Sequence, residues 1–222
     1  MCGRYSLAPT ENIAARFDIQ QAQLTLLPRY NVAPSQSMPV VVRNSPNRLI
    51  EMQWGLIPSW SKEPRVQFST INARAETISK SPVFRGPFKS QRCLVPASGF
   101  YEWRQTGQGK QPYCIRLNDG ELFAFAGLYD VWHDPAGNEL YSYTIITTTP
   151  NGLVAPIHNR MPVILHRDAE DVWLDKETDS ARLMSLLSAY PADKMEAYPV
   201  SRAVNDPSNE GAELIQQPRT TS

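Results

Sequence analysis

The chain has 222 residues, of which 41% are hydrophobic and 20% charged, with 22 basic against 22 acidic side chains. This length fits one large domain or two small ones, and the composition is typical of a soluble globular protein. Zero net charge excludes nucleic-acid binding through overall charge, and we expect neither a signal peptide nor a membrane span, because no long apolar run is present.

Nineteen prolines are spread through the chain, so we expect short elements and many loops. Thr10 is the expected cap of the first helix, whose apolar face holds Ile13 and Phe17. Residues 28–34 are interpreted as an extended loop and 54–60 as an apolar packed loop. The other elements expected in this half are paired strands over 39–43 and 49–54, across a turn at 44–47, and a short helix over 73–80.

Strand-like runs separated by turns predict an antiparallel meander in the second half of the chain. Its strands are expected over 92–96, 100–104, 113–117, 122–132 and 140–149. Further on, we expect a strand over 161–165, helices over 168–174 and 180–189, a late strand over 196–204 and a disordered tail over 217–222. An alternating βαβ pattern is absent, which favours one domain of mixed, strand-rich character.

Residue 2 is a cysteine, which is small enough for methionine aminopeptidases to remove Met1. The mature chain would then carry a free α-amine and a thiol on Cys2. An α-amine has a pKa near ~7.7–8.0, so part of it is neutral at cytosolic pH and can attack an aldehyde. The thiol can then close on the imine and form a five-membered thiazolidine. From the N-terminus alone, an accidental small residue is the favoured interpretation.

Glu102 stands between aromatic residues. If this run is a strand, Phe100 and Glu102 share one face, while Tyr101 and Trp103 share the other. A carboxylate among aromatic side chains would be partly desolvated, which raises its pKa toward the range of a general acid or base. A Glu102 that faces solvent or pairs with an arginine is the commoner alternative.

Three histidines are present. His158 lies in a short loop between Pro156 and Pro162 that can hold an imidazole in a fixed place, and an exposed loop histidine is an equal alternative. His133, beside a turn, and His166, after an expected strand, are interpreted as surface residues.

Asn72 can hold a reacting oxygen or amine without adding charge, although a helix cap is a strong competing role. Arg74 suits a phosphate ligand or a surface ion pair. Trp54 is assigned to the core, whereas Trp60 is the tryptophan expected at the surface. There its indole could stack on an unpaired base, which is worth about 1–3 kcal/mol.

The three cysteines are odd in number and lack CxxC spacing, which argues against a disulfide framework or a zinc site and for a reducing cytoplasm. Cys93 and Cys114 are expected to be inert core thiols. Charge is unevenly distributed, since residues 62–104 carry eight bases against three acids and 168–196 carry eight acids against three bases. A neutral total can therefore hide a basic face.

Eight sequence blocks, in order along most of the chain, together resemble the SOS response-associated peptidase (SRAP) family. These blocks are MCGR at 1–4, RYNVAP at 29–34, WGLIP at 54–58, INARAET at 71–77, CLVP at 93–96, GFYEW at 99–103, HNRMP at 158–162 and PVSRAVN at 199–205. One block alone would be a weak signal, whereas eight in register are highly specific.

The resemblance implies a single compact α+β domain over 1–216, built around a coiled, barrel-like, mostly antiparallel sheet with flanking short helices. Family members bind single-stranded DNA that contains an abasic site. Their mature N-terminal cysteine forms a thiazolidine with the ring-opened sugar, which gives a covalent protein–DNA crosslink. An enzyme is therefore implied, with strand incision through a Schiff-base lyase route and an autoproteolytic maturation activity.

The resemblance also carries roles over to individual residues. The catalytic roles fall on Cys2 as nucleophile, Asn72 for positioning, Glu102 for proton transfer at the α-amine, and His158 for opening of the sugar ring. The implied DNA contacts are Arg4, Arg74 and Arg160 as phosphate ligands, with Pro34 and Trp60 shaping the strand or stacking on bases. No cofactor and no metal are implied. We expect a cytoplasmic monomer without membrane contacts, associated with the nucleoid when bound to DNA.

Two other functions remain open at this stage. In a cysteine peptidase or N-terminal-nucleophile hydrolase, Cys2 would attack an amide, His158 would act as base and Asn72 would orient the base or bind the oxyanion. In a non-catalytic single-strand-binding module, arginines and tryptophans would bind DNA without covalent chemistry. Cleavage of peptides beyond Met1 would distinguish the first, and unchanged DNA retention in Cys2→Ala would distinguish the second.

Overall fold

The fold is seen in a computed structural model, which describes residues 2–20, 26–44, 46–64 and 70–217. Five strands form a closed barrel: β3 (Ser37–Val42), β4 (Arg48–Trp54), β6 (Arg92–Ala97), β9 (Phe123–His133) and β10 (Glu139–Thr148). Antiparallel pairing links β4, β3, β6, β9 and β10 in that order, and a parallel pairing of β10 with β4 completes the ring. Closure leaves no free edge along these strands.

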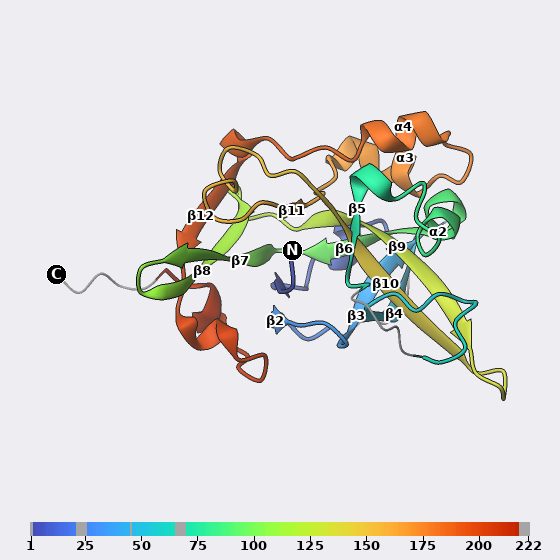
Figure 1. The fold of residues 1–222 in the computed structure, drawn as a ribbon, viewed down its shortest axis with the longest axis horizontal. Coiled ribbons are helices and arrows are strands. Elements are labelled where there is room, and N and C mark those ends of the chain that lie inside the picture. Colours follow the sequence, from blue (N-terminus) through green and yellow to red (C-terminus); the bar gives the residue numbers. More distant parts are fainter. Residues whose placement is uncertain (1, 21–25, 45, 65–69, 218–222) are drawn as a thin grey trace.

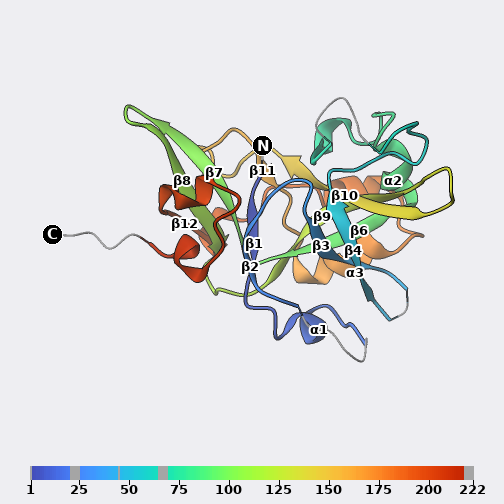
Figure 2. The same cartoon turned by 90° about the horizontal axis from the view of Figure 1, so that it is seen from below.

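A second, antiparallel sheet lies beside the barrel (Figures 1 and 2). Its strands, in spatial order, are β12 (Met195–Pro199), β8 (Gly109–Leu117), β7 (Gly99–Thr106), β1 (Tyr5–Leu7) and β2 (Arg29–Val32). Two short strands, β5 (Asn72–Arg74) and β11 (Met161–Pro162), pair with β10. The result is an α+β domain with a barrel-like, mostly antiparallel sheet structure, as expected.

The helices are short. They are α1 (Ile13–Arg16), α2 (Arg85–Ser90), α3 (Glu170–Leu174) and α4 (Ser180–Ser185), with 3-10 turns η1 (Ala75–Thr77), η2 (Arg167–Ala169), η3 (Ala192–Lys194), η4 (Arg202–Asn205) and η5 (Ala212–Ile215). Helix α3 packs on β6, where the indole of Trp173 donates to the Cys93 carbonyl at 3.0 Å. None of the described helices has the length and apolar character to cross a membrane.

Tyr5 connects the second sheet to the barrel. Its ring is fully buried and meets Trp54 and Phe125 edge-on, at centroid distances of 5.2 and 5.9 Å. Its hydroxyl shares a 2.8 Å hydrogen bond with that of Tyr143 on β10. Burying a side chain of this size contributes roughly 1.5–3 kcal/mol, and the paired hydroxyls avoid the cost of unsatisfied polar groups. Strand β1, which begins two residues after Gly3, is thereby fixed against the core.

Several sequence-based predictions are confirmed. The strands expected over 39–43 and 49–54 pair as β3 and β4, and residues 54–60 form a packed loop in which Leu56 and Ile57 are buried. Trp54 lies in the core, whereas the Trp60 side chain is 65% exposed. Cys93 and Cys114 are buried thiols, and His133 and His166 lie at the surface.

Other predictions are wrong at the level of single elements. Thr10 does not cap a helix, because α1 starts at Ile13 and the Thr10 hydroxyl donates instead to the Leu26 carbonyl at 2.7 Å. The loop expected over 28–34 contains β2, and the helix expected over 73–80 is strand β5 followed by one 3-10 turn. In the last two cases pairing with a distant strand outweighs the local pattern, because β2 pairs with β1 and β5 pairs with β10.

The expected meander is also divided between two sheets. Strand β8 pairs with β7 and β12, while the next strand, β9, pairs with β6 and β10. Helix α4 ends at Ser185 rather than 189, and the late strand ends at Pro199, where the chain continues into η4. Of the tail expected over 217–222, residues 218–222 lie outside the described part of the chain.

Candidate functional site

The start of the chain is placed by the pairing of β1 with β7. Tyr5 lies opposite Phe100, and the amide of Tyr101 donates to the Arg4 carbonyl at 3.0 Å. Continued in the antiparallel sense, this register brings Cys2 to the part of β7 that contains Glu102. The Cys2 side chain is fully buried, and its thiol lies 3.7 Å from the Arg4 carbonyl oxygen. Burial, and then the nearby Glu102 carboxylate, raise the pKa of this thiol, so it is neutral at rest.

Glu102 is the buried acid of the site. Phe100 belongs to the main core, while Tyr101 and Trp103 pack in a second cluster, so the two faces of β7 divide as the alternation predicts. Glu102 is 2% exposed, and burial raises the pKa of its carboxyl group from 4.5 to about 7. No described residue donates a hydrogen bond to its buried Oε1. A carboxyl group that titrates near neutral pH can both give and take a proton.

His158 approaches this acid from the loop that precedes β11. Its Nδ1 lies 3.7 Å from Glu102 Oε1 and accepts the backbone N–H of Arg160 at 3.1 Å. An amide can only donate, so we assign the ring proton of the neutral imidazole to Nε2. The loop is closed by hydrogen bonds from the amides of Ile157 and His158 to the Val154 carbonyl. Burial lowers the pKa of His158, which favours the neutral ring.

A cavity of about 430 Å³ opens at this pair. It is lined by Glu102, Trp103, Lys110, His158 and Asn205, which come from β7, β8, the loop before β11 and η4. The Trp103 indole donates to Asn205 Oδ1 at 2.7 Å, which holds one wall in place. The volume is in the range of pockets that hold small organic ligands.

Asn72 is buried in β5, so the competing role as a helix cap is wrong. Its Nδ2 donates to the Ile145 carbonyl at 3.4 Å, and its Oδ1 is buried without a partner among the described residues. Such an acceptor is costly unless something donates to it. No described contact joins Asn72 to Cys2, Glu102 or His158, and its positioning role stays a prediction.

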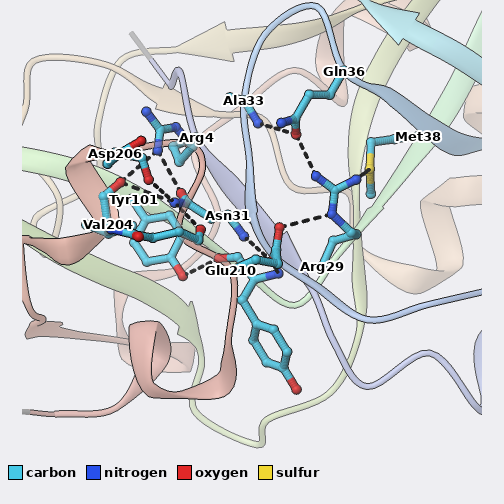
Figure 3. A network of polar contacts seen from close by, with 12 residues as sticks. Arg4, Arg29, Asn31, Ala33, Gln36, Met38, Tyr101, Val204, Asp206 and Glu210 are labelled. Atoms are coloured by element: carbon cyan, nitrogen blue, oxygen red, sulfur yellow. Dashed lines mark hydrogen bonds and ion pairs between the residues drawn. The ribbon is translucent and has the colours of Figure 1, made fainter.

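The three arginines expected to bind phosphate differ in whether their guanidinium groups already have partners within the protein. Arg4 directs Nη1 inward, to Asn31 Oδ1 and the Val204 carbonyl, both at 2.7 Å (Figure 3). Arg160 forms a two-pronged ion pair with Glu76, at 2.6 and 3.0 Å, and also donates to the Thr147 carbonyl. Arg74 is exposed, and no hydrogen bond or ion pair within the described ranges engages its side chain.

The loop that carries Trp60 is hydrogen-bonded to two residues of β9. The buried Asp130 carboxylate accepts the amide of Ser59 at 2.9 Å, and the Trp132 indole donates to the Ser61 carbonyl at 2.7 Å. These two contacts fix the backbone on both sides of Trp60 and leave its indole exposed. Pro34, the other expected base contact, is half-buried two residues after the end of β2.

Sequence reasoning missed four residues that the fold brings to the site: Lys110, Asn205, Asn31 and Asp130. Lys110 and Asn205 line the cavity, and Asn31 and Asp130 fasten Arg4 and the Trp60 loop. Asn31 and Asn205 stand inside recognised blocks and could have been singled out, whereas Lys110 carries no local signal. Within the described residues no cluster of three or more His, Cys, Asp or Glu side chains is placed to bind a metal ion.

Comparison with known proteins agrees with this architecture. Abasic site processing protein YoqW of Bacillus subtilis (strain 168) is 49% identical, over 97% of this chain and 99% of its own length. Abasic site processing protein HMCES of Gallus gallus is 39% identical, over 85% of this chain and 66% of its own length. A crystal structure of a protein from Bacteroides thetaiotaomicron superposes with a TM-score of 0.86 at 32% identity, covering 98% of this chain and all of that one.

The family model described as SOS response associated peptidase (SRAP) matches residues 1–207, a stretch that contains Cys2, Asn72, Glu102 and His158. The chain therefore belongs to the SRAP family.

Proposed function

We propose that this protein processes abasic sites in single-stranded DNA by capturing the sugar covalently on Cys2. The observation that carries the proposal is the burial of Cys2 beside Glu102, whose pKa is about 7, with His158 3.7 Å from that acid at a sugar-sized cavity. The relatives named as abasic site processing proteins support this choice of substrate.

The chemistry begins once Met1 has been removed. The α-amine of Cys2 attacks the sugar aldehyde and forms a carbinolamine, whose hydroxyl leaves as water after it takes a proton from Glu102. Loss of water leaves a protonated imine, to which the thiol then adds: the C–S bond forms, the thiol proton returns to the Glu102 carboxylate, and the nitrogen keeps its proton as the N–H of the ring. The net reaction joins aldehyde and aminothiol into a thiazolidine and releases one water.

His158 and Asn72 serve the steps around this capture. The cyclic sugar must open before an aldehyde exists, which requires removing a proton from the anomeric hydroxyl and giving one to the ring oxygen. A neutral imidazole beside a carboxyl group suits that exchange, and it suits the reverse reaction equally. Asn72 Oδ1, buried without a described donor, would accept a hydrogen bond from the amine or a sugar hydroxyl.

The DNA strand would be held by the exposed indole of Trp60 stacking on a base and by Arg74 on a phosphate. Pro34 would shape the strand beside them. Arg4 and Arg160 keep their inward partners in this arrangement, so only their remaining N–H groups could reach a phosphate. Strand incision would follow from the same imine, if a base removes a sugar proton before the thiol closes the ring.

A cysteine peptidase is less well supported by the site. Thiol peptidases depend on a lowered thiol pKa that gives thiolate beside an imidazolium, whereas here burial raises the pKa of Cys2 and lowers that of His158. Autoproteolytic removal of Met1 remains part of the proposal, because an amide at Cys2 would block the amine chemistry. Digestion of unrelated peptides is not expected.

The test is denaturing electrophoresis of mature protein mixed with single-stranded DNA that carries one abasic site. We expect a denaturant-resistant adduct with the wild type and none with Cys2→Ala, which should retain slow incision through its α-amine. Residues appended before Cys2 convert the amine to an amide and should stop both reactions. Adduct formation by Cys2→Ala, or full activity of the extended protein, would overturn the proposal.

A further inference from the structure

The cavity beside Glu102 and His158 is also lined by a lysine, which no role assigned so far uses. Lys110, at the start of β8, lines this cavity, and its side chain is exposed. No described residue forms an ion pair or a side-chain hydrogen bond with its ammonium group. Elsewhere in the lining, the Trp103 indole already donates to Asn205 Oδ1. Lys110 is thus a lining group that can take a ligand.

The register of the β7–β8 hairpin places Lys110 beside Trp103. Lys110 lies opposite Gln105, so it shares a face of the hairpin with Trp103, whereas Glu102 belongs to the other face. The cavity lining takes in both faces, because it includes Trp103 and Lys110 as well as Glu102. Strand β1 pairs only with the first residues of β7, and from Glu102 onward no described strand covers that edge. Burial, and also the charge of Lys110, lower the pKa of His158, which agrees with an ammonium close to the imidazole.

A sugar that enters this cavity brings its own negative charge. Each abasic sugar within a strand is joined to two phosphates, and Glu102, with a pKa of about 7, is partly ionised at neutral pH. A phosphate beside a carboxylate is repelled unless a cation stands between them or next to them. The guanidinium groups of Arg4 and Arg160 are already engaged by other residues of the protein. The charge that the cavity itself offers is that of Lys110.

We propose that Lys110 binds a backbone phosphate that flanks the captured abasic sugar, and so positions the sugar against Cys2, Glu102 and His158. This inference rests on the proposed function and adds a positioning residue to it. Lysine acts as a mobile point charge on a flexible stem, which suits one phosphate oxygen better than the planar, fixed geometry of an arginine pair.

The experiment measures non-covalent binding to single-stranded DNA that contains a reduced, aldehyde-free abasic analogue, at several salt concentrations. Loss of one phosphate contact lowers the slope of log K against log salt by about 0.7 for a single strand. We expect this decrease in Lys110→Gln and recovery of the slope in Lys110→Arg. Lys176→Gln, which removes an exposed lysine after α3, is the matched control and should keep the wild-type slope. Equal slopes for Lys110→Gln and the control would overturn the assignment.

A second measurement identifies the phosphate. Replacing the phosphate on one side of the abasic analogue, then on the other, by a neutral methylphosphonate should weaken wild-type binding at one of the two positions. Replacing the phosphate at that position should not weaken DNA binding by Lys110→Gln any further, because this variant has already lost the contact. Equal losses in both proteins at both positions contradict the role of Lys110.

Crosslinking to aldehyde-bearing DNA separates this inference from the proposed function. If wild-type protein forms no adduct, the proposed function fails. If the wild type forms the adduct and Lys110→Gln keeps its salt slope, only the Lys110 assignment fails.

Discussion

Glu102→Gln should change how the stability of the protein depends on pH. Burial raises the pKa of Glu102 from 4.5 to about 7 in the folded protein. The folded state therefore holds this proton more tightly than the unfolded state does. Its contribution is fully present below pH 4.5 and is lost as pH rises through about 7. One pKa unit corresponds to 1.36 kcal/mol, so ionisation of the buried group costs about 3 kcal/mol.

Glutamine has nearly the same shape and carries no charge, so it should escape this cost. We expect Glu102→Gln to match the wild type in unfolding free energy near about pH 4.5, and to exceed it by up to about 3 kcal/mol at about pH 8. Urea unfolding monitored by tryptophan fluorescence at a series of pH values measures the difference. Glu51→Gln, on an exposed position of β4, controls for loss of a strand carboxylate.

The same variant should lose function, because glutamine cannot transfer a proton. Crosslinking should slow by roughly 10²–10⁴-fold, the usual contribution of a general acid or base. Gains in stability and losses in rate would then come from one side chain. A stability difference between Glu102→Gln and the wild type that stays constant from pH 4.5 to pH 8 would refute the reasoning, because burial would then impose no charge penalty.

Three further predictions concern other parts of the site. His158→Ala should slow crosslinking yet leave binding of an intact single strand nearly unchanged, which band-shift titration can check. Trp60→Ala should weaken that binding by about 1–3 kcal/mol, and Asp130→Ala should weaken it by part of this amount. The double variant should bind as weakly as Trp60→Ala alone, and additive losses of binding free energy would show that Asp130 does not act through Trp60. Asn31→Ala removes the acceptor of Arg4 and three carbonyl contacts, and should lower the unfolding free energy by about 2–3 kcal/mol; a change below about 0.5 kcal/mol in urea unfolding would contradict this.

The prediction for Asn31 follows from how the end of the chain is fastened. The Asn31 side chain donates to the carbonyls of Val204, Asp206 and Asn209, and the Glu210 carboxylate accepts the amide of Asn31 at 3.0 Å (Figure 3). Arg4 joins the same cluster. The segment after β12 therefore holds Arg4 in place, directly before β1 and two residues from Cys2.

Part of the site followed from local sequence. The alternation around Glu102 placed its side chain on the face of the strand opposite to that of Tyr101 and Trp103, and its aromatic neighbours predicted a desolvated acid. The exposure of Trp60 and the burial of Trp54 followed from their polar and apolar surroundings. Each of these properties depends on neighbours within a few residues, which is the range over which strand geometry acts.

The remaining features depended on partners far away in the chain. Nothing near Arg4 indicates that its guanidinium binds the carbonyl of Val204, 200 residues away, or that β10 closes a barrel by pairing in parallel with β4. The sequence around Asn72 would suit a helix cap, whereas in the structure Asn72 lies in β5, which pairs with β10.

The sequence by itself determined the candidate reactive groups of this protein: a cysteine at position 2, a carboxyl group among aromatic residues and an imidazole between prolines. Tertiary structure alone decided which of its cations remain free, because an arginine's freedom depends on the acceptors that folding brings to it. It left Lys110 available at the cavity and paired Arg4 and Arg160 with acceptors from distant parts of the chain.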